Sequence, residues 1–125
     1  METTVLIVDD IMVNRLLLVE LIKKLGYKHC EADNGKKAIE QLESRNIDII
    51  LMDIEMPVMN GLETTKHIRT KGTGNKKNVP IVALTAHNPM DYFEEFESAG
   101  FNELITKPYV LSKISAVIEK LCLLK

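Results

Sequence analysis

Apolar runs alternate along the chain with polar segments that contain turn residues. Three of these runs do not alternate, and they cover residues 4–8, 47–52 (where only Asp48 is charged) and 80–84. Continuous apolar runs of this length are typical of strands buried on both faces of a parallel sheet. Weaker strand patterns cover residues 28–32 and 104–105. The pattern therefore predicts a sheet with a well-buried centre.

Between these runs, apolar residues recur at helical spacing. The predicted helices cover residues 11–25, 35–45, 62–70, 89–99 and 110–123. Gly26 and Gly100 directly follow two of them and predict their C-terminal ends, and Pro89 favours a helix start. The polar segment 71–78 is predicted to be a mobile loop. Strands and helices that alternate at this spacing predict one doubly wound α/β domain over residues 1–125, with five parallel strands.

Composition and charge exclude several classes of protein. The chain has 125 residues, 46% hydrophobic and 27% charged, which is ordinary for a globular domain. A formal net charge of −2 argues against direct nucleic-acid or membrane-surface binding, and no apolar run reaches the ~20 residues of a membrane span. Cys30 and Cys122 have no metal-type spacing and are predicted to be reduced core thiols. Together with the absence of a signal-peptide pattern, they predict a cytoplasmic protein.

Polar side chains stand where the apolar strands end. The residues concerned are Asp9, Asp10, Asp53, Thr85 and Lys107. Because parallel strands carry their carboxyl ends to the same edge of a sheet, we expect these side chains to form one cluster. Three neighbouring carboxylates repel one another unless a counter-ion lies between them, and one lysine cannot neutralise three. Oxygen-only ligands favour Mg²⁺, and the absence of His or Cys from the cluster argues against zinc.

Such a cluster suits phosphoryl transfer, which needs positioning and charge neutralisation more than covalent machinery. Asp53 is the predicted nucleophile and would form an aspartyl phosphate, with Mg²⁺ held by Asp9, Asp10 and Asp53. Thr85 and Lys107 would contact the other phosphoryl oxygens. The alternative roles are a helix cap for Thr85, and solvated loop charges or a structural salt bridge for the others. No P-loop is present, so a bound nucleotide is not the expected donor.

Four motifs in this order resemble those of a response-regulator receiver domain, over essentially the whole chain. They are Val8-Asp9-Asp10, Met52-Asp53-Ile54-Glu55-Met56-Pro57 with Asn60-Gly61 following, Leu84-Thr85-Ala86, and Lys107-Pro108-Tyr109. The resemblance implies a flavodoxin-like fold with strand order 2-1-3-4-5. It also implies that the phosphodonor is a phosphohistidine on a histidine kinase or a histidine phosphotransfer protein. Phosphorylation would then alter the surface formed by residues 90–123.

The resemblance implies further residue roles. The main-chain carbonyl of Glu55 would be another Mg²⁺ ligand, and the main chain of Ala86 would contact the phosphate. His87 would line the rim of the site, and the Lys107–Pro108 peptide bond would be cis, which X–Pro bonds allow. Many receivers carry Tyr, Phe or His three residues before the lysine, where this chain has Leu104. Leu104 lacks the ring of that aromatic switch, so we expect a smaller or differently built conformational change.

Two other classes of function stay open. A haloacid-dehalogenase-like phosphatase also uses an aspartyl nucleophile. Such an enzyme has a second acid two residues after the nucleophile and a Thr two residues after that acid. This chain has Glu55 at the first of these positions and Pro57, not Thr, at the second. A constitutive interaction module would never be phosphorylated. We expect a switch without independent substrate turnover, a monomer or weak dimer, and no output domain in this chain. Whether it is a free-standing regulator or part of a hybrid histidine kinase is left open.

Overall fold

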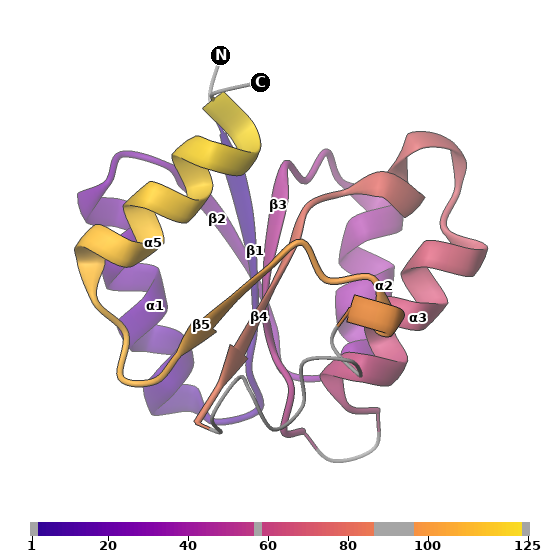
Figure 1. Cartoon of the computed structure of the whole chain (residues 1–125), viewed down its shortest axis with the longest axis horizontal. Coiled ribbons are helices and arrows are strands. Elements are labelled where there is room, and N and C mark those ends of the chain that lie inside the picture. The colour runs from indigo at the N-terminus through magenta and orange to yellow at the C-terminus, as the bar shows by residue number, and fades with distance from the viewer. Residues whose placement is uncertain (1–2, 57–58, 87–96, 124–125) are drawn as a thin grey trace.

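A five-stranded parallel sheet forms the centre of the molecule (Figure 1). The computed structural model describes residues 3–56, 59–86 and 97–123. The strands are β1 (Thr4–Val8), β2 (Lys28–Ala32), β3 (Ile49–Asp53), β4 (Ile81–Thr85) and β5 (Glu103–Thr106). Their order in the sheet is β2-β1-β3-β4-β5, and every neighbouring pair is parallel. The predicted fold class and strand order are therefore confirmed.

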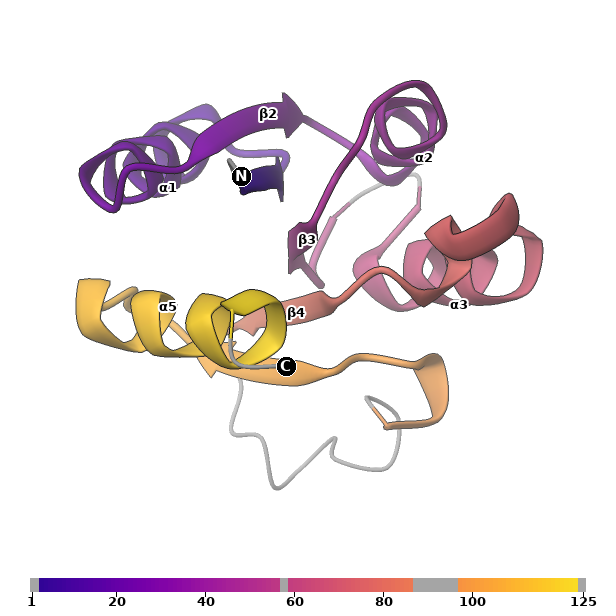
Figure 2. The ribbon, with the colours of Figure 1, turned by 90° about the horizontal axis from the view of Figure 1, so that it is seen from above.

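Helices cover both faces of the sheet (Figures 1 and 2). On one face lie α1 (Met12–Lys24) and α5 (Leu111–Ile118), and α5 continues as a π-helical turn over Glu119–Leu123. On the other face lie α2 (Gly35–Ser44) and α3 (Gly61–Lys71). Of the helix predicted over residues 89–99, positions 97–99 are helical and the rest lies outside the described residues.

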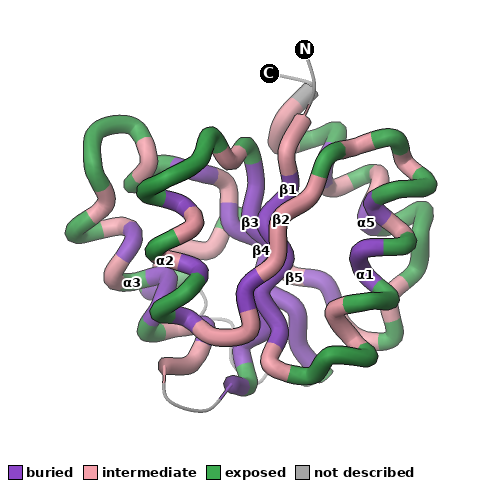
Figure 3. Tube along the Cα trace, turned by 180° about the vertical axis from the view of Figure 1, so that it is seen from behind, coloured by how far each residue is buried: buried purple, intermediate pink, exposed green. Residues whose placement is uncertain are grey.

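The core has two halves because strand side chains alternate between the faces of the sheet. Val5, Ile7 and Leu51 pack with residues of α1 and α5, whereas Leu6 and Ile50 pack with residues of α2 and α3. Figure 3 shows the buried sheet in the middle and the exposed outer sides of the helices. This two-sided burial explains why the central strands are apolar without alternation.

Two expectations from the sequence need correction. The segment 71–78 is not simply a loop, because residues Gly74–Asn78 form a short 3₁₀ helix. Its Lys76 ammonium donates hydrogen bonds to the carbonyls of Leu42 and Glu43, each at 2.7 Å, at the C-terminal end of α2. Cys30 and Cys122 form no disulfide, as predicted, but both are half-buried rather than part of the inner core.

No helix within the described ranges is long and apolar enough to cross a membrane.

Candidate functional site

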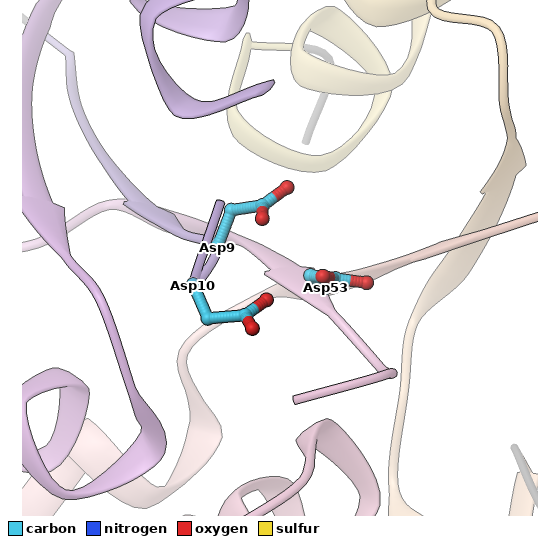
Figure 4. Close-up of side chains that lie close together, drawn as sticks. All are labelled: Asp9, Asp10 and Asp53. Carbon is cyan, nitrogen blue, oxygen red and sulfur yellow. The ribbon is translucent and has the colours of Figure 1, made fainter. Parts of the chain in front are cut away.

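Three carboxylates meet at the carboxyl edge of the sheet. Val8 pairs with Met52, so the residues that follow them, Asp9 and Asp53, leave two neighbouring strands side by side. Each of Asp9, Asp10 and Asp53 offers a carboxylate oxygen, and these oxygens all lie within 4.8 Å of one another. Figure 4 shows the Asp9 and Asp10 carboxylates on the side of the β1–α1 turn that faces Asp53. The structure thus brings together the predicted acids.

Lys107 and Thr85 come to the same edge from β5 and β4. The Lys107 ammonium lies 3.4 Å from Asp53 Oδ1, and the Lys107 main-chain N–H donates to the Thr85 carbonyl at 2.8 Å. Thr85 is fully buried and pairs with Thr106. The Lys107–Pro108 peptide bond is cis, as the resemblance implies. The ammonium is therefore already beside the predicted acceptor.

Main-chain and guanidinium donors hold the acids in place. Asp9 Oδ1 accepts a hydrogen bond from the Ile11 N–H at 2.9 Å, and Asp53 Oδ1 accepts one from the Glu55 N–H at 3.2 Å. The Arg15 guanidinium donates to the Asp9 carbonyl at 3.0 Å and also pairs with a carboxylate on β2. These bonds leave the second oxygens of the carboxylates available for other ligands.

Burial dominates the electrostatics of the site. Asp53 is 1% exposed, and burial together with the negative charge of Asp9 raises its pKa to about 6, against the attraction of Lys107 and the Glu55 N–H. Burial also raises the pKa of Asp9 above its usual range. Both shifts show that the acids are costly to ionise together without a cation.

The acid cluster fits a hard divalent cation. Asp9 Oδ2 and Asp10 Oδ1 are buried and have no hydrogen-bond partner among the described residues. A buried carboxylate oxygen without a donor needs a cation or a water molecule to meet it. All the donor atoms are oxygens from carboxylates, which suits Mg²⁺, an ion that takes few protein ligands and keeps several waters.

The remaining predicted residues lie around this cluster. The Glu55 side chain is exposed, and Ala86 is exposed directly after β4. Leu104 is half-buried and packs in a small cluster with Ile54, the residue that follows the predicted acceptor. His87 lies outside the described residues. Leu104 therefore packs in the same small cluster as the residue next to Asp53.

Three residues near the acids were not identified from the sequence as part of the site. Arg15 binds the Asp9 carbonyl, and Gly61 lies so close to Asp53 that a Cβ would stand 2.6 Å from the Asp53 carbonyl oxygen. The Tyr109 hydroxyl is buried without a hydrogen-bond partner among the described residues, and burial and the charges of Asp9 and Asp53 raise its pKa. Only the Asn60-Gly61 turn and the aromatic after Pro108 were visible as local signals.

A family model described as the response regulator receiver domain matches residues 5–119. The chain therefore belongs to this family, whose members are signalling domains of two-component and phosphorelay systems.

Relatives include proteins of very different length. Two-component response regulator 24 of Arabidopsis thaliana is 37% identical over 121 residues, covering 96% of this chain and 84% of the relative. The CAI-1 autoinducer sensor kinase/phosphatase CqsS of Vibrio cholerae is 36% identical over 119 residues, which is 92% of this chain but 17% of the relative. The chain thus spans most of a short regulator and a small part of a long kinase.

Solved receiver structures agree with the fold along nearly the whole chain. The receiver domain of a sensor histidine kinase from Pseudomonas aeruginosa, with magnesium coordinated in its active site cleft, is 30% identical with a TM-score of 0.87, covering 97% of this chain and 98% of that one. The receiver domain of Ssk1 from Saccharomyces cerevisiae, in complex with the histidine phosphotransfer protein Ypd1, is 30% identical with a TM-score of 0.86. The match covers 96% of this chain and 88% of that one.

Proposed function

We propose that the chain is a phospho-acceptor switch that takes a phosphoryl group onto Asp53. The observation that carries this proposal is the convergence of three carboxylates and one ammonium on a single edge of the sheet. Asp53 is the acid that touches Lys107 and stands at the end of the central strand. This arrangement supports nucleophilic attack by Asp53 on phosphorus, with the other groups neutralising charge.

Mg²⁺ is the proposed cofactor. Asp9, Asp10 and Asp53 would hold it with their carboxylates, and the main-chain carbonyl of Glu55 would be a further ligand. When bound, the ion would neutralise the acids and the phosphoryl oxygens, which is the contribution of metals in phosphoryl transfer. The magnesium in the Pseudomonas aeruginosa receiver supports this choice of ion.

The transfer step is an exchange of bonds at phosphorus. An Asp53 carboxylate oxygen forms the new P–O bond while the P–N bond to the donor imidazole breaks, and the electron pair of that bond returns to the imidazole nitrogen. Lys107, the Thr85 hydroxyl and the Ala86 N–H would bind the phosphoryl oxygens. Thr85 could reach them because it ends the strand next to β3.

A protein that carries a phosphohistidine is the proposed donor. Exposed apolar residues follow the turns of the site in the chain. The exposed large hydrophobic residues among those described lie in two segments, at Ile11, Met12, Val13, Leu16, Leu17, Val110 and Leu111. One segment directly follows the Asp9–Asp10 turn and the other follows Lys107–Pro108. Exposed apolar surface beside a charged site is typical of protein–protein contact. The yeast receiver bound to a histidine phosphotransfer protein supports this class of partner.

The proposed output of the switch is a change on the face that includes β5 and α5, to which Leu104 would couple the site through Ile54. Residues 90–96 of the predicted output surface lie outside the described residues. We expect no independent substrate turnover, no direct contact with nucleic acid or membrane, and a monomer or weak dimer. A cytoplasmic location is supported by two cysteines that form no disulfide. The chain is similar both to a short response regulator and to part of a long sensor kinase. The site is therefore equally compatible with a free-standing regulator and with a domain of a hybrid kinase.

Incubation with acetyl phosphate and Mg²⁺, followed by intact mass measurement after rapid quenching, tests the proposal. The wild-type chain should gain one phosphoryl group, and neither Asp53→Asn nor a sample with excess EDTA should gain it. A wild-type chain that gains no phosphoryl mass would contradict the proposal. A turnover assay with a generic phosphate ester separates the switch from a phosphatase. A phosphatase would hydrolyse the ester repeatedly, and we expect no turnover.

A further inference from the structure

The turn between β1 and α1, which carries two of the three acids, is held by its main chain. The Asp9 N–H donates a hydrogen bond at 3.2 Å to the carbonyl of Ala32, the last residue of β2. The Asp9 carbonyl accepts a hydrogen bond at 3.0 Å from Nη1 of Arg15. This carbonyl belongs to the peptide bond that joins Asp9 to Asp10. The main chain is therefore fixed on both sides of Asp9.

The two acids of this turn differ in how their side chains are held. Asp9 Oδ1 accepts a hydrogen bond from the Ile11 N–H at 2.9 Å. Asp10 Oδ1 is buried and has no hydrogen-bond partner in the part of the chain that the structure describes, although its carboxylate lies on the side that faces Asp53 (Figure 4). Because a peptide unit is planar, a fixed Asp9 carbonyl also fixes the Cα atom from which the Asp10 side chain leaves. The direction of the Asp10 carboxylate therefore depends on the contact with Arg15.

Arg15 is in turn held by an acid on the edge strand. Its Nε donates to Glu31 Oε1 at 3.0 Å, and its side chain is only 18% exposed. Glu31 lies within β2 and pairs with Ile7 in the sheet. The guanidinium is a rigid plane, so the contact with Glu31 also sets where Nη1 lies. A series of contacts thus runs from the sheet through Glu31 and Arg15 to the peptide bond between the two acids.

Charge attraction does not explain a guanidinium at this place. A positive charge beside a cation site repels the incoming ion and lowers its affinity. Glu31 offsets the charge of Arg15, and the hydrogen bond to the Asp9 carbonyl is what the pair contributes to the turn. A positional benefit and an electrostatic cost have opposite signs, so an experiment can separate them.

We propose that Arg15 is a positioning residue of the cation site: held by Glu31, it fixes the peptide plane between Asp9 and Asp10 and so orients the Asp10 carboxylate toward the cation. Groups behind the ligands of a metal orient them in many proteins. The inference rests on the proposed function, because it assigns a role toward the same Mg²⁺ ion.

Calorimetric titration of Arg15→Met with Mg²⁺ tests this role, with Lys23→Met as the matched control. Lys23 lies on the same helix, is 58% exposed and has only a 4.0 Å pair with Glu20. Both variants lose one positive charge, which by itself would strengthen Mg²⁺ binding. Arg15→Met should instead bind Mg²⁺ about tenfold more weakly than the wild type, whereas Lys23→Met should bind at least as tightly as the wild type.

Urea unfolding of the same samples separates positioning from a purely structural role. A structural role would lower the stability of Arg15→Met without changing the Mg²⁺ affinity of the folded chain, and this result would overturn the inference. Mg²⁺ binding by Arg15→Met that is as tight as in the wild type, or tighter, would overturn it as well. A wild-type chain that binds no Mg²⁺ would overturn the proposed function together with the inference.

Two substitutions of Glu31 give a second test at equal charge. Glu31→Gln and Glu31→Ala both remove the carboxylate charge, but glutamine keeps an oxygen that can accept the hydrogen bond from Arg15 Nε. Glu31→Ala should therefore bind Mg²⁺ severalfold more weakly than Glu31→Gln. Equal Mg²⁺ affinities of these two variants, in a wild-type background that binds the ion, would overturn the role of Glu31 in holding Arg15.

Discussion

Replacing Asp53 with asparagine should stabilise the metal-free chain at neutral pH. Burial and the Asp9 charge raise the pKa of Asp53 from 3.8 to about 6, so ionising this side chain opposes folding. At about 1.4 kcal/mol for each pKa unit, the penalty is on the order of 3 kcal/mol above pH 6. The raised pKa already includes the attraction of Lys107. Asparagine can still accept the Glu55 N–H bond, but its amide NH₂ group is a donor and fits the site less well than a carboxylate. The expected net gain is therefore about 1–3 kcal/mol in the free energy of unfolding.

The pH dependence has a definite sign. Because the pKa of Asp53 is higher in the folded chain than in the unfolded one, the folded chain binds more protons between pH 3.8 and about 6. The contribution of Asp53 to stability therefore falls as the pH rises through this window and is constant above it. The gain in unfolding free energy of Asp53→Asn over the wild type should be small near pH 3.8 and should reach its full value above about pH 6.

Urea unfolding in EDTA, at about pH 4 and about pH 8, measures this difference. Glu20→Gln is the control, because the Glu20 side chain is 67% exposed and its pair with Lys23 at 4.0 Å contributes little. An Asp53→Asn variant that is no more stable than the wild type at the higher pH would refute the reasoning. The same would follow from an equal gain at both pH values.

Three further predictions concern the same site. Mg²⁺ at a hundredfold excess over its dissociation constant should add about 2.7 kcal/mol to the stability of the wild type, and much less to Asp9→Asn, by urea unfolding. Gly61→Ala should lower stability by about 1–3 kcal/mol, because the new Cβ meets the main chain of Asp53 and Ile54; an unchanged midpoint would contradict the close approach. Lys107→Met should slow phosphorylation by acetyl phosphate about a hundredfold in quenched time courses, because it removes a donor to the phosphoryl oxygens; an unchanged rate would exclude that role.

The strand ends were predictable because the chemistry changes abruptly there. The buried runs that end at Val8 and Met52 are followed at once by carboxylates, and parallel strands bring such residues to one edge. The edge strand β2 gave a weaker pattern, since four of its five residues are not fully buried. Its lack of a continuous apolar run follows from its place at the edge of the sheet.

Contacts that depend on the paths of turns and loops were not predictable. The bond from Arg15 to the Asp9 carbonyl depends on how the first turn of α1 lies against β2, and the approach of Gly61 to Asp53 depends on the path of the loop between them. The 3₁₀ helix over Gly74–Asn78 is likewise held by Lys76, which binds carbonyls at the end of α2. Hydrophobic periodicity carries no information on such contacts, because they depend on polar groups and on the path of the main chain and not on the apolar pattern.

The crystal structure of the chain with Mg²⁺ and beryllofluoride, a mimic of the phosphoryl group, tests the central claim most directly. The site described above predicts one Mg²⁺ ion bound by Asp9, Asp10 and Asp53, and the beryllofluoride attached to Asp53 with Lys107 beside its fluorine atoms. Acids that point apart with no ion between them, or beryllofluoride attached to another residue, would contradict it.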